Sequence, residues 1–442
     1  MQSSPRTIET RRTPPAQVVG WVRSYDWDTT PGRLRVALIV LVFGVLLAGG
    51  VAVYAAIARV STTRDIAEHL EPLNADVTTL YRSLAEADAT VAAGYLSGGV
   101  EPSQVQARYR DDMVAATTSL ARAGTQAGGE VVTATRIADI TTQLPLYAGL
   151  VERARANNRQ GFAVGEAYLR RASELMQNSI LPAAAQLQQR QAARLDDAYR
   201  RAGSVPLVAL ASCGVGLAGL GWAQGFLLRR TRRVFNVGLV LASVAVITGL
   251  VWWTGAVAAS ADSLEGALGH SQSVSDALAP AQIAALQARA FESLELVSRT
   301  GAAIEPEFEA RMQRLTRNNG AGGALGVATR FATDQKGKML VQAAVDDSLG
   351  YARAHQEVRR LDDAGEYTKA VDAAVNTSAA TAFGRLDTAL KTAVEYEHGA
   401  FGTDIERARV RLTGLPIGTG GLAIVAAVGV ALGIRQRLEE YR

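Results

Sequence analysis

The sequence predicts an all-α membrane protein with four transmembrane helices and two tandem extracytoplasmic four-helix bundles of up-down-up-down topology. Three observations lead to this fold class. Four long segments lack charged residues, arginines cluster at one end of each, and the two long connections between them carry matching helical patterns. Neither connection shows the alternation of apolar and polar residues that is typical of a strand.

The composition separates this chain from ordinary soluble proteins. Of its 442 residues, 48% are hydrophobic and 20% are charged, whereas soluble domains are about 25% charged. The net charge of +4 gives no support to a nucleic-acid-binding protein. The single cysteine, Cys213, excludes an intramolecular disulfide and a multi-cysteine metal site, and the four histidines lack metal-ligand spacing. We expect no metal, no cofactor and no nucleic-acid partner.

Four apolar segments are long enough to cross a bilayer, which takes about 20 residues of helix. The predicted spans are residues 36–58, 205–228, 234–258 and 412–434. None of them has an Asp, Glu, Lys or Arg in its interior. Charged residues inside a membrane mark ion paths and proton relays, so their absence disfavours a pump or a coupled transporter.

The arginines set the predicted orientation, because the cytoplasmic flanks of membrane spans carry an excess of Lys and Arg. Arginines are frequent before the first span, in the RRTRR loop at 229–233, and after the last span. The N-terminal tail 1–35, this loop and the C-terminal tail 435–442 are therefore predicted inside, and 59–203 and 259–411 outside. We expect a multi-pass protein of the plasma (inner) membrane with both termini cytoplasmic and in contact with membrane lipid.

Residues 59–203 read as four helices. A heptad of apolar residues runs through 66–91, as in a helix packed in a bundle. Helix breaks are predicted after residue 97, at 124–129 and at 157–161, where glycine or asparagine gathers. Pro72 and Pro182 are expected to kink the first and last of these helices.

Residues 259–411 repeat this pattern at a constant offset of 204 residues. The pair Glu101-Pro102 falls on Glu305-Pro306. Spans also nearly match, so the repeating unit is span, bundle, span. Further matched pairs are Tyr147 and Tyr351, Arg155 and Arg359, and Gly161 and Gly365.

The matched Glu-Pro pairs and the turns that end in Gly161 and Gly365 are expected at the bundle tips, and turns are where binding residues are usually placed on a rigid scaffold. A favourable acid in the first turn of a helix is the alternative interpretation of Glu101 and Glu305. The candidate partner-binding residues are Glu101, Pro102, Asn157, Asn158, Glu305, Pro306, Asp362 and Asp363.

Two other groups of residues have competing interpretations. Bundle arginines such as Arg82, Arg153, Arg155 and Arg359 can clamp a carboxylate ligand, but for most of them we expect a solvated helix face. The G-x-G-x-x-G motif at 214–219 lies inside a span, where it predicts helix packing through small residues and not nucleotide binding.

The N-terminal tail carries aromatic residues beside arginines, which predicts either a position at the lipid interface or a docking site for a cytosolic protein. The candidate residues for cytoplasmic contact are Trp21, Tyr25 and Trp27. No Ser/His/Asp set, phosphate-binding loop or kinase motif is present in the sequence. We find no catalytic constellation and expect a protein that is not an enzyme.

The bundles resemble the ligand-binding domains of bacterial chemoreceptors and sensor kinases, although the chain has no HAMP, kinase or methylated coiled-coil domain. The whole chain resembles the GlnX-type membrane proteins of actinobacteria in its four spans with RRTRR at the midpoint, its tandem bundles, its short tails and its Arg/Ala-rich composition. That resemblance implies a solute-binding lipoprotein outside, which takes glutamine, glutamate or aspartate, and a cytosolic serine/threonine kinase, protein kinase G, inside. It carries over no site residue.

Two other classes of function remain open. One is a receptor that binds a small molecule directly in its own helical bundles, and the other is a structural membrane scaffold. A basic or aromatic pocket between helices would favour the direct receptor. Featureless bundles with polar tips would favour a protein partner.

Overall fold

The computed structural model describes residues 30–99, 101–126, 130–204, 207–231, 236–299, 304–332 and 334–439. Within these ranges the named elements are all helical, and the isolated β-bridge between Arg317 and Gly322 is the nearest approach to a sheet. The helices divide between two compact units. We call residues 1–57, 206–255 and 414–442 the membrane unit, and residues 58–205 and 256–413 the polar unit.

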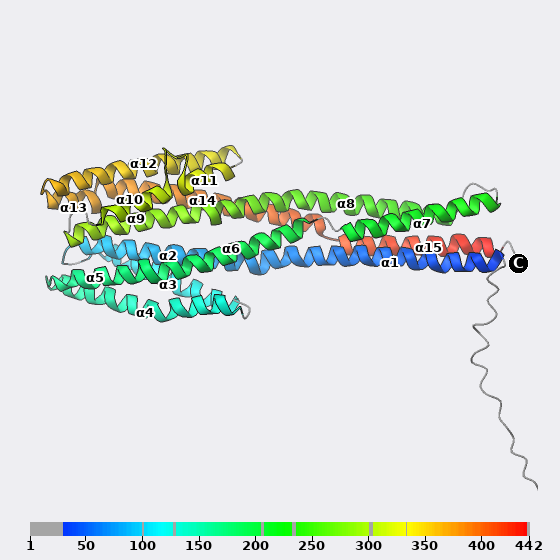
Figure 1. The fold of residues 1–442 in the computed structure, drawn as a ribbon, viewed down its shortest axis with the longest axis horizontal. Helices are drawn as coiled ribbons and strands as arrows, with labels where there is room; N and C mark the ends of the chain where they lie inside the picture. The colour runs from blue at the N-terminus through cyan, green and yellow to red at the C-terminus, as the bar shows by residue number, and fades with distance from the viewer. Residues whose placement is uncertain are drawn as a thin grey trace, which may run out of the picture. The chain divides into compact units, whose positions relative to one another are not determined.

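Four helices are long and apolar enough to cross a membrane, which confirms the predicted all-α, multi-pass membrane protein. The predicted spans lie mostly within α1 (Thr30–Asp65), α7 (Leu207–Thr231), α8 (Val237–Gln272) and α15 (Leu415–Glu439) (Figure 1). Which side of the membrane each end faces stays a prediction.

Glycines let two helices of the membrane unit come into backbone contact. A Cβ atom at Gly429 of α15 would lie 2.8 Å from the carbonyl oxygen of Gly238 in α8, and one at Gly433 would lie 3.1 Å from the Cα of Gly238. No larger residue fits at that separation. Close backbone approach through small residues is a common way for helices to associate in lipid, where apolar surface alone gives no preference.

The packing predicted for the glycine motif at 214–219 is looser than this. A Cβ atom at Gly216 or Gly219 would meet side chains of α1 at 3.7 and 3.6 Å, which are ordinary contact distances. Gly214 has no neighbouring atom within 4 Å. The motif therefore packs only in part, and the tight contact lies at glycines that the sequence analysis did not single out.

We expect Gly429→Leu to destabilise the membrane unit by about 1–3 kcal/mol, because the new side chain must push α8 and α15 apart. Gly421→Leu, on the same helix but with no atom within 4 Å, is the matched control. Thermal unfolding of the purified protein in detergent measures both. Equal melting temperatures for the two variants would mean that the glycine contact contributes nothing.

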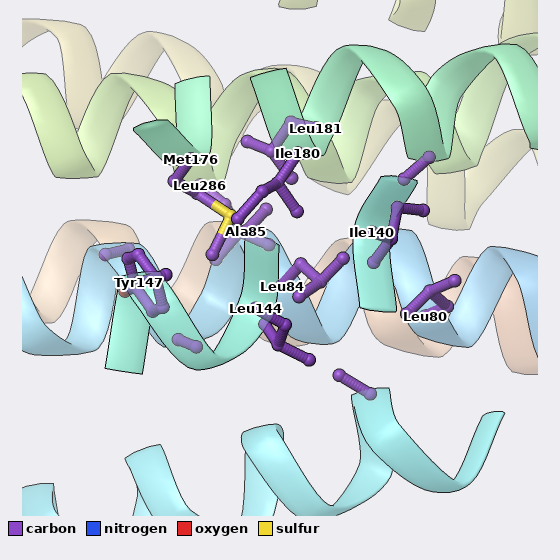
Figure 2. Packing of buried hydrophobic residues seen from close by; sticks show 14 of the residues in the cluster. Leu80, Leu84, Ala85, Ile140, Leu144, Tyr147, Met176, Ile180, Leu181 and Leu286 are labelled. Carbon is purple, nitrogen blue, oxygen red and sulfur yellow. The ribbon is translucent and has the colours of Figure 1, made fainter. Parts of the chain in front are cut away.

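The polar unit contains two helix sets. The first set consists of η1 (Ile66–Leu70), α2 (Glu71–Leu96), α3 (Ser103–Gln126), α4 (Val131–Arg159), α5 (Val164–Leu175), η2 (Met176–Ile180) and α6 (Leu181–Gly203). The predicted heptad is confirmed as a buried seam, because Val77, Leu80 and Leu84 are fully buried. They pack with α4 and η2 in one hydrophobic cluster (Figure 2).

The second set differs from the four helices predicted for it. It follows η3 (Ser273–Leu278) and consists of α9 (Ala279–Ser298), α10 (Glu305–Leu315), α11 (Gly323–Phe331), α12 (Gln335–Asp363), α13 (Tyr367–Val375) and α14 (Ser378–Leu412). The predicted second helix is divided because α10 ends at Leu315, where Thr316 is extended, and the chain then turns between Arg317 and Gly322. In this turn Asn318 and Asn319 adopt left-handed backbone angles, with φ of 51° and 53°. The predicted last helix is divided at 376–377.

Helix α9 joins the two sets into one core. Its residues Leu286 and Leu294 belong to the cluster of the first set, while Ala285 and Ala288 belong to the cluster of the second. Figure 2 shows Leu286 gathered with residues of α2 and η2. Because α9 is covered on both sides, its polar residues are buried too, and each needs a partner inside the protein.

Each of the three π-turns among the described residues ends two residues before a proline, at Pro72, Pro182 and Pro280. In every case the residue just before the proline donates its backbone N–H to the carbonyl five residues back, as Leu181 does to Met176. Proline has no N–H to donate, and a wider turn before it accommodates the gap in the helical ladder. The predicted interruptions at Pro72 and Pro182 therefore take the form of π-turns.

Candidate functional site

A carboxylate lies in the middle of the first helix set. Asp88 of α2 is 2% exposed and accepts hydrogen bonds from Ser173 Oγ at 2.9 Å and Gln177 Nε2 at 2.8 Å, with Tyr147 Oη at 3.4 Å. All three donors are neutral. Burial raises the pKa of Asp88 to about 6, although the three hydrogen bonds act in the opposite direction.

A second buried carboxylate lies 204 residues later, at Glu292 of α9. It accepts hydrogen bonds from Tyr351 Oη at 3.0 Å and His355 Nδ1 at 2.9 Å, and it pairs with Arg289 at 2.5 Å. Burial acts to raise the pKa of Glu292, but Arg289 and His355 outweigh it and hold the pKa below its usual value. The tyrosine on the third helix of each set thus contacts the buried acid on the first.

His355 links this carboxylate to a second one. Its Nε2 lies 3.1 Å from Glu305 at the start of α10, and its ring stacks on Phe308 with a centroid separation of 3.5 Å. Burial acts to lower the pKa of His355, but the two glutamates raise it to about 9. The imidazole is therefore charged at neutral pH and holds α9, α10 and α12 together.

An arginine–glutamate pair also recurs in both sets. Arg155 Nε of α4 lies 2.8 Å from Glu101, and Arg359 Nε of α12 lies 3.6 Å from Glu305. Both arginine side chains are only 12% exposed, so the expected solvated helix face is wrong for these two residues. Arg155 also stacks over the ring of Tyr109, and Arg359 reaches Glu295 at 3.1 Å.

The predicted partner-binding residues fall into two groups in the structure. The carboxylates of Glu101 and Glu305 are held in the pairs described above, which gives them a structural role. Asn158 Nδ2 donates to the Tyr95 carbonyl at 3.1 Å and ties α4 to α2. Pro102 and Pro306 are exposed. Whether any of them binds a partner stays a prediction.

The remaining candidates lie beside the helix ends that they help to form. Asn157 donates to the carbonyl of Arg153 within α4, and Asp362 and Asp363 pair with Arg359 at 3.0 and 2.8 Å. The glycines that follow, Gly161 and Gly365, have φ of +70° and +76°, a conformation that ends both helices and favours glycine. Trp21, Tyr25 and Trp27 lie outside the described residues.

Two exposed apolar residues at the turn between α4 and α5 escaped the sequence analysis. Phe162, directly after Gly161, is 56% exposed, and Val164, the first residue of α5, is 49% exposed. An aromatic residue directly after a helix-ending glycine is the signal that could have identified them. Together with Asn157 and Asn158 they give this turn a mixed apolar and amide surface.

The polar unit also contains a cavity of about 550 Å³ between the two helix sets. Its lining comes from α2, α6, α8, η3, α9 and α10, which are far apart in the sequence. No local pattern could have predicted it. The polar residues in its wall are Tyr81, Gln188, Gln189, Asp196, Ser271, Gln272, Asp276, Gln287 and Arg314.

Residues 62–200 match the family described as the actinobacterial sensor domain. The match supports a sensor of the actinobacterial type. It begins in α1 and ends in α6, and so covers the first helix set with Asp88, Tyr147 and the Glu101–Arg155 pair. No curated protein and no solved structure matches the chain. Similarity to a sensor domain does not by itself identify a ligand or a partner.

The charge on His355 predicts how stability depends on pH. Its pKa is about 9 in the folded protein against 6.5 as the reference value, so the folded state binds the proton more tightly. The stabilisation is complete below about pH 6.5 and is lost as pH rises through about 9, a change of about 3 kcal/mol. Thermal unfolding between pH 6 and pH 9.5 measures it.

His355→Gln removes the titrating group and should flatten the pH dependence in that window. His69→Gln is the control, because the His69 side chain is 71% exposed. If the His355 variant loses stability with pH as steeply as the unchanged protein, another group is responsible.

Proposed function

We propose that this protein is a transmembrane sensor that relays the availability of amino acids outside the cell, through a solute-binding lipoprotein, to a cytosolic serine/threonine kinase. The observation that carries the proposal is the match of residues 62–200 to a sensor domain. The chain has four helices apolar enough to span a membrane, which gives such a domain a route to the other side. The amino acid and the kinase come from the resemblance to GlnX-type proteins.

Uninterrupted helix favours mechanical transmission of a signal. Residues Val36–Leu96 are one continuous helical stretch, with a π-turn inside it, that contains both an apolar span and Asp88. A binding event can bias such a helix only through a difference in affinity between two arrangements. Shifts of 1–2 Å along helices are a known form of this switching.

The lipoprotein is proposed to dock at the turn between α4 and α5. Glu101 and Arg155 neutralise each other there, so charge attraction is a weak contribution. Phe162 and Val164 are exposed, and an exposed aromatic residue surrounded by polar side chains is typical of the centre of a protein interface. The matching turn of the second set, at Gly365, has no apolar residue directly after it, because Glu366 follows.

We expect Phe162→Ser to weaken capture of the lipoprotein by about tenfold or more, since interface aromatics contribute 2 kcal/mol or more. Val131→Ser is the matched control: Val131 is 77% exposed and lies at the opposite end of α4. Pull-down from solubilised membranes measures both, and circular dichroism checks that helicity is retained. Equal capture by the two variants would remove this turn from the interface.

Inside the cell, the N-terminal tail is the proposed contact for the kinase, through Trp21, Tyr25 and Trp27. This requires the tail to be cytoplasmic. Reporter fusions after residues 33, 231 and 442 should therefore read cytoplasmic, and a fusion within 130–160 should read external, because arginine-rich flanks stay inside. A cytoplasmic signal from the fusion within 130–160 would reverse the orientation and refute the proposed direction of signalling.

A direct small-molecule receptor is the second candidate, and the cavity between the helix sets favours it. This pocket lies between helices and includes a basic and an aromatic side chain, Arg314 and Tyr81. A basic or aromatic pocket between helices is the feature that favours a direct receptor. The two candidates are compatible, because a sensor can respond both to a docked protein and to a small ligand.

A further inference from the structure

The cavity between the helix sets has the size of a ligand site. Its volume of about 550 Å³ lies within the range of about 300–1,000 Å³ that is usual for small-molecule pockets. Its apolar lining includes Leu268 and Ile283, and its polar lining includes the buried residues Gln188, Ser271 and Gln287. An apolar wall with a few polar groups is the common composition of such sites.

The side-chain amide nitrogen of Gln188 is a hydrogen-bond donor for which the described part of the chain supplies no acceptor. The residue is 4% exposed, and its Nε2 is buried without a hydrogen-bond partner. Buried amide groups are nearly always hydrogen-bonded, so an unpaired one in a cavity wall indicates that the acceptor comes from outside the chain. Gln188 therefore marks the cavity as a place where something polar binds.

The charges on the wall have opposite signs and are not paired with each other. Neither Arg314 of α10 nor Asp276 of η3 forms an ion pair with any described residue. Asp196, in contrast, forms an ion pair with Arg200 and accepts a hydrogen bond from Gln272 Nε2 at 2.9 Å. One available cation and one available anion around a single cavity complement a molecule that carries both charges.

A hydrogen-bond relay leads from this cavity to the buried carboxylate of the first set. Gln287 Nε2 donates to Gln177 Oε1 at 2.8 Å, and Gln177 Nε2 donates to Asp88 at 2.8 Å. The relay begins on α9, passes through η2 and ends on α2. A ligand that moves Gln287 therefore changes the hydrogen bonding of Asp88, which lies inside the region that matches a sensor domain.

We propose that the cavity binds a small zwitterion, the size of a free amino acid or a dipeptide, whose carboxylate faces Arg314 and whose ammonium group faces Asp276. An oxygen of the ligand accepts a hydrogen bond from Gln188 after the buried amide turns toward the cavity. Amide side chains such as Gln189 and Gln272 can donate and accept, and so suit the remaining polar groups. The signalling consequence of this inference rests on the proposed sensor function, whereas the binding of the zwitterion does not depend on it.

Isothermal titration calorimetry of the purified full-length protein in lipid nanodiscs tests the site. The probes are the common free L-amino acids and alanyl-alanine as zwitterions, succinate as an anion, putrescine as a cation and glucose as a neutral molecule. We expect saturable binding of at least one zwitterion and none of the other three. Absence of binding by every zwitterion, or equal binding of a probe with one charge or none, would overturn the proposal.

Three substitutions should each raise the Kd for the zwitterion by about tenfold or more: Gln188→Leu, Asp276→Asn and Arg314→Gln. Gln186→Leu on the exposed side of α6 and Arg330→Gln on α11 are controls that should bind normally. Gln188→Leu should also melt no lower than the unchanged protein without ligand, because the lost donor had no partner. Normal binding by all three variants would place the ligand elsewhere.

The outcome is separable from that of the proposed function. Calorimetry needs neither the lipoprotein nor the kinase. If no zwitterion binds but Phe162→Ser abolishes lipoprotein capture, the sensor function stands and the cavity inference fails. If a zwitterion binds but capture is never detected, the cavity inference stands and the lipoprotein route fails.

Discussion

The burial of Asp88 in the first helix set and of Glu292 in the second determines where the surrounding helices lie. An ionised carboxylate removed from water is costly by several kcal/mol unless hydrogen-bond donors meet it. Around Asp88 those donors come from α4, α5 and η2, and around Glu292 they come from α9 and α12. The apolar cores are rich in alanine, whose small side chains interlock weakly. Polar contacts therefore fix the register that apolar packing leaves loose.

The two carboxylates meet this constraint in different ways. The donors to Asp88 are neutral and do not offset the effect of burial, which raises its pKa to about 6. Glu292 has Arg289 and the charged His355, and its pKa falls below the usual value. The two carboxylates thus occupy matching positions and each contacts a tyrosine, but the charges of their other partners differ. The first carboxylate accepts a proton under mildly acidic conditions, whereas the second remains ionised.

Much of the fold could be predicted from the sequence because the signals are local. The long apolar helices and the heptad of α2 depend on residues a few positions apart, and the structure shows both. The repeat offset identified Tyr147, Arg155 and Glu101 as matched positions, but not what they contact. Their partners lie 54 to 59 residues away in the chain, and a local periodic pattern cannot predict contacts at that separation.

The features that could not be predicted have identifiable physical causes. Asp88 lies inside an apolar helix face, where it looks like an interruption of the pattern, and its match with Glu292 at the repeat offset was the available signal. The division between α10 and α11 is a turn that includes two asparagines in left-handed conformation, and apolar periodicity carries no signal for it. The cavity has no local signature, because six elements from both helix sets contribute to its wall. The prolines located the helix interruptions but not their form.

The π-turns before Pro72, Pro182 and Pro280 have a consequence for the evolution of the chain. A π-turn holds one more residue than the α-turn it replaces, and one residue corresponds to about 100° of rotation around the helix axis. The apolar stripe before each turn and the stripe after it are therefore out of phase by about that angle. Faces that are selected by lipid and faces that are selected by protein packing need not share one heptad register. A single-residue insertion in these helices can be absorbed as a change of turn, without rotating a buried face into water.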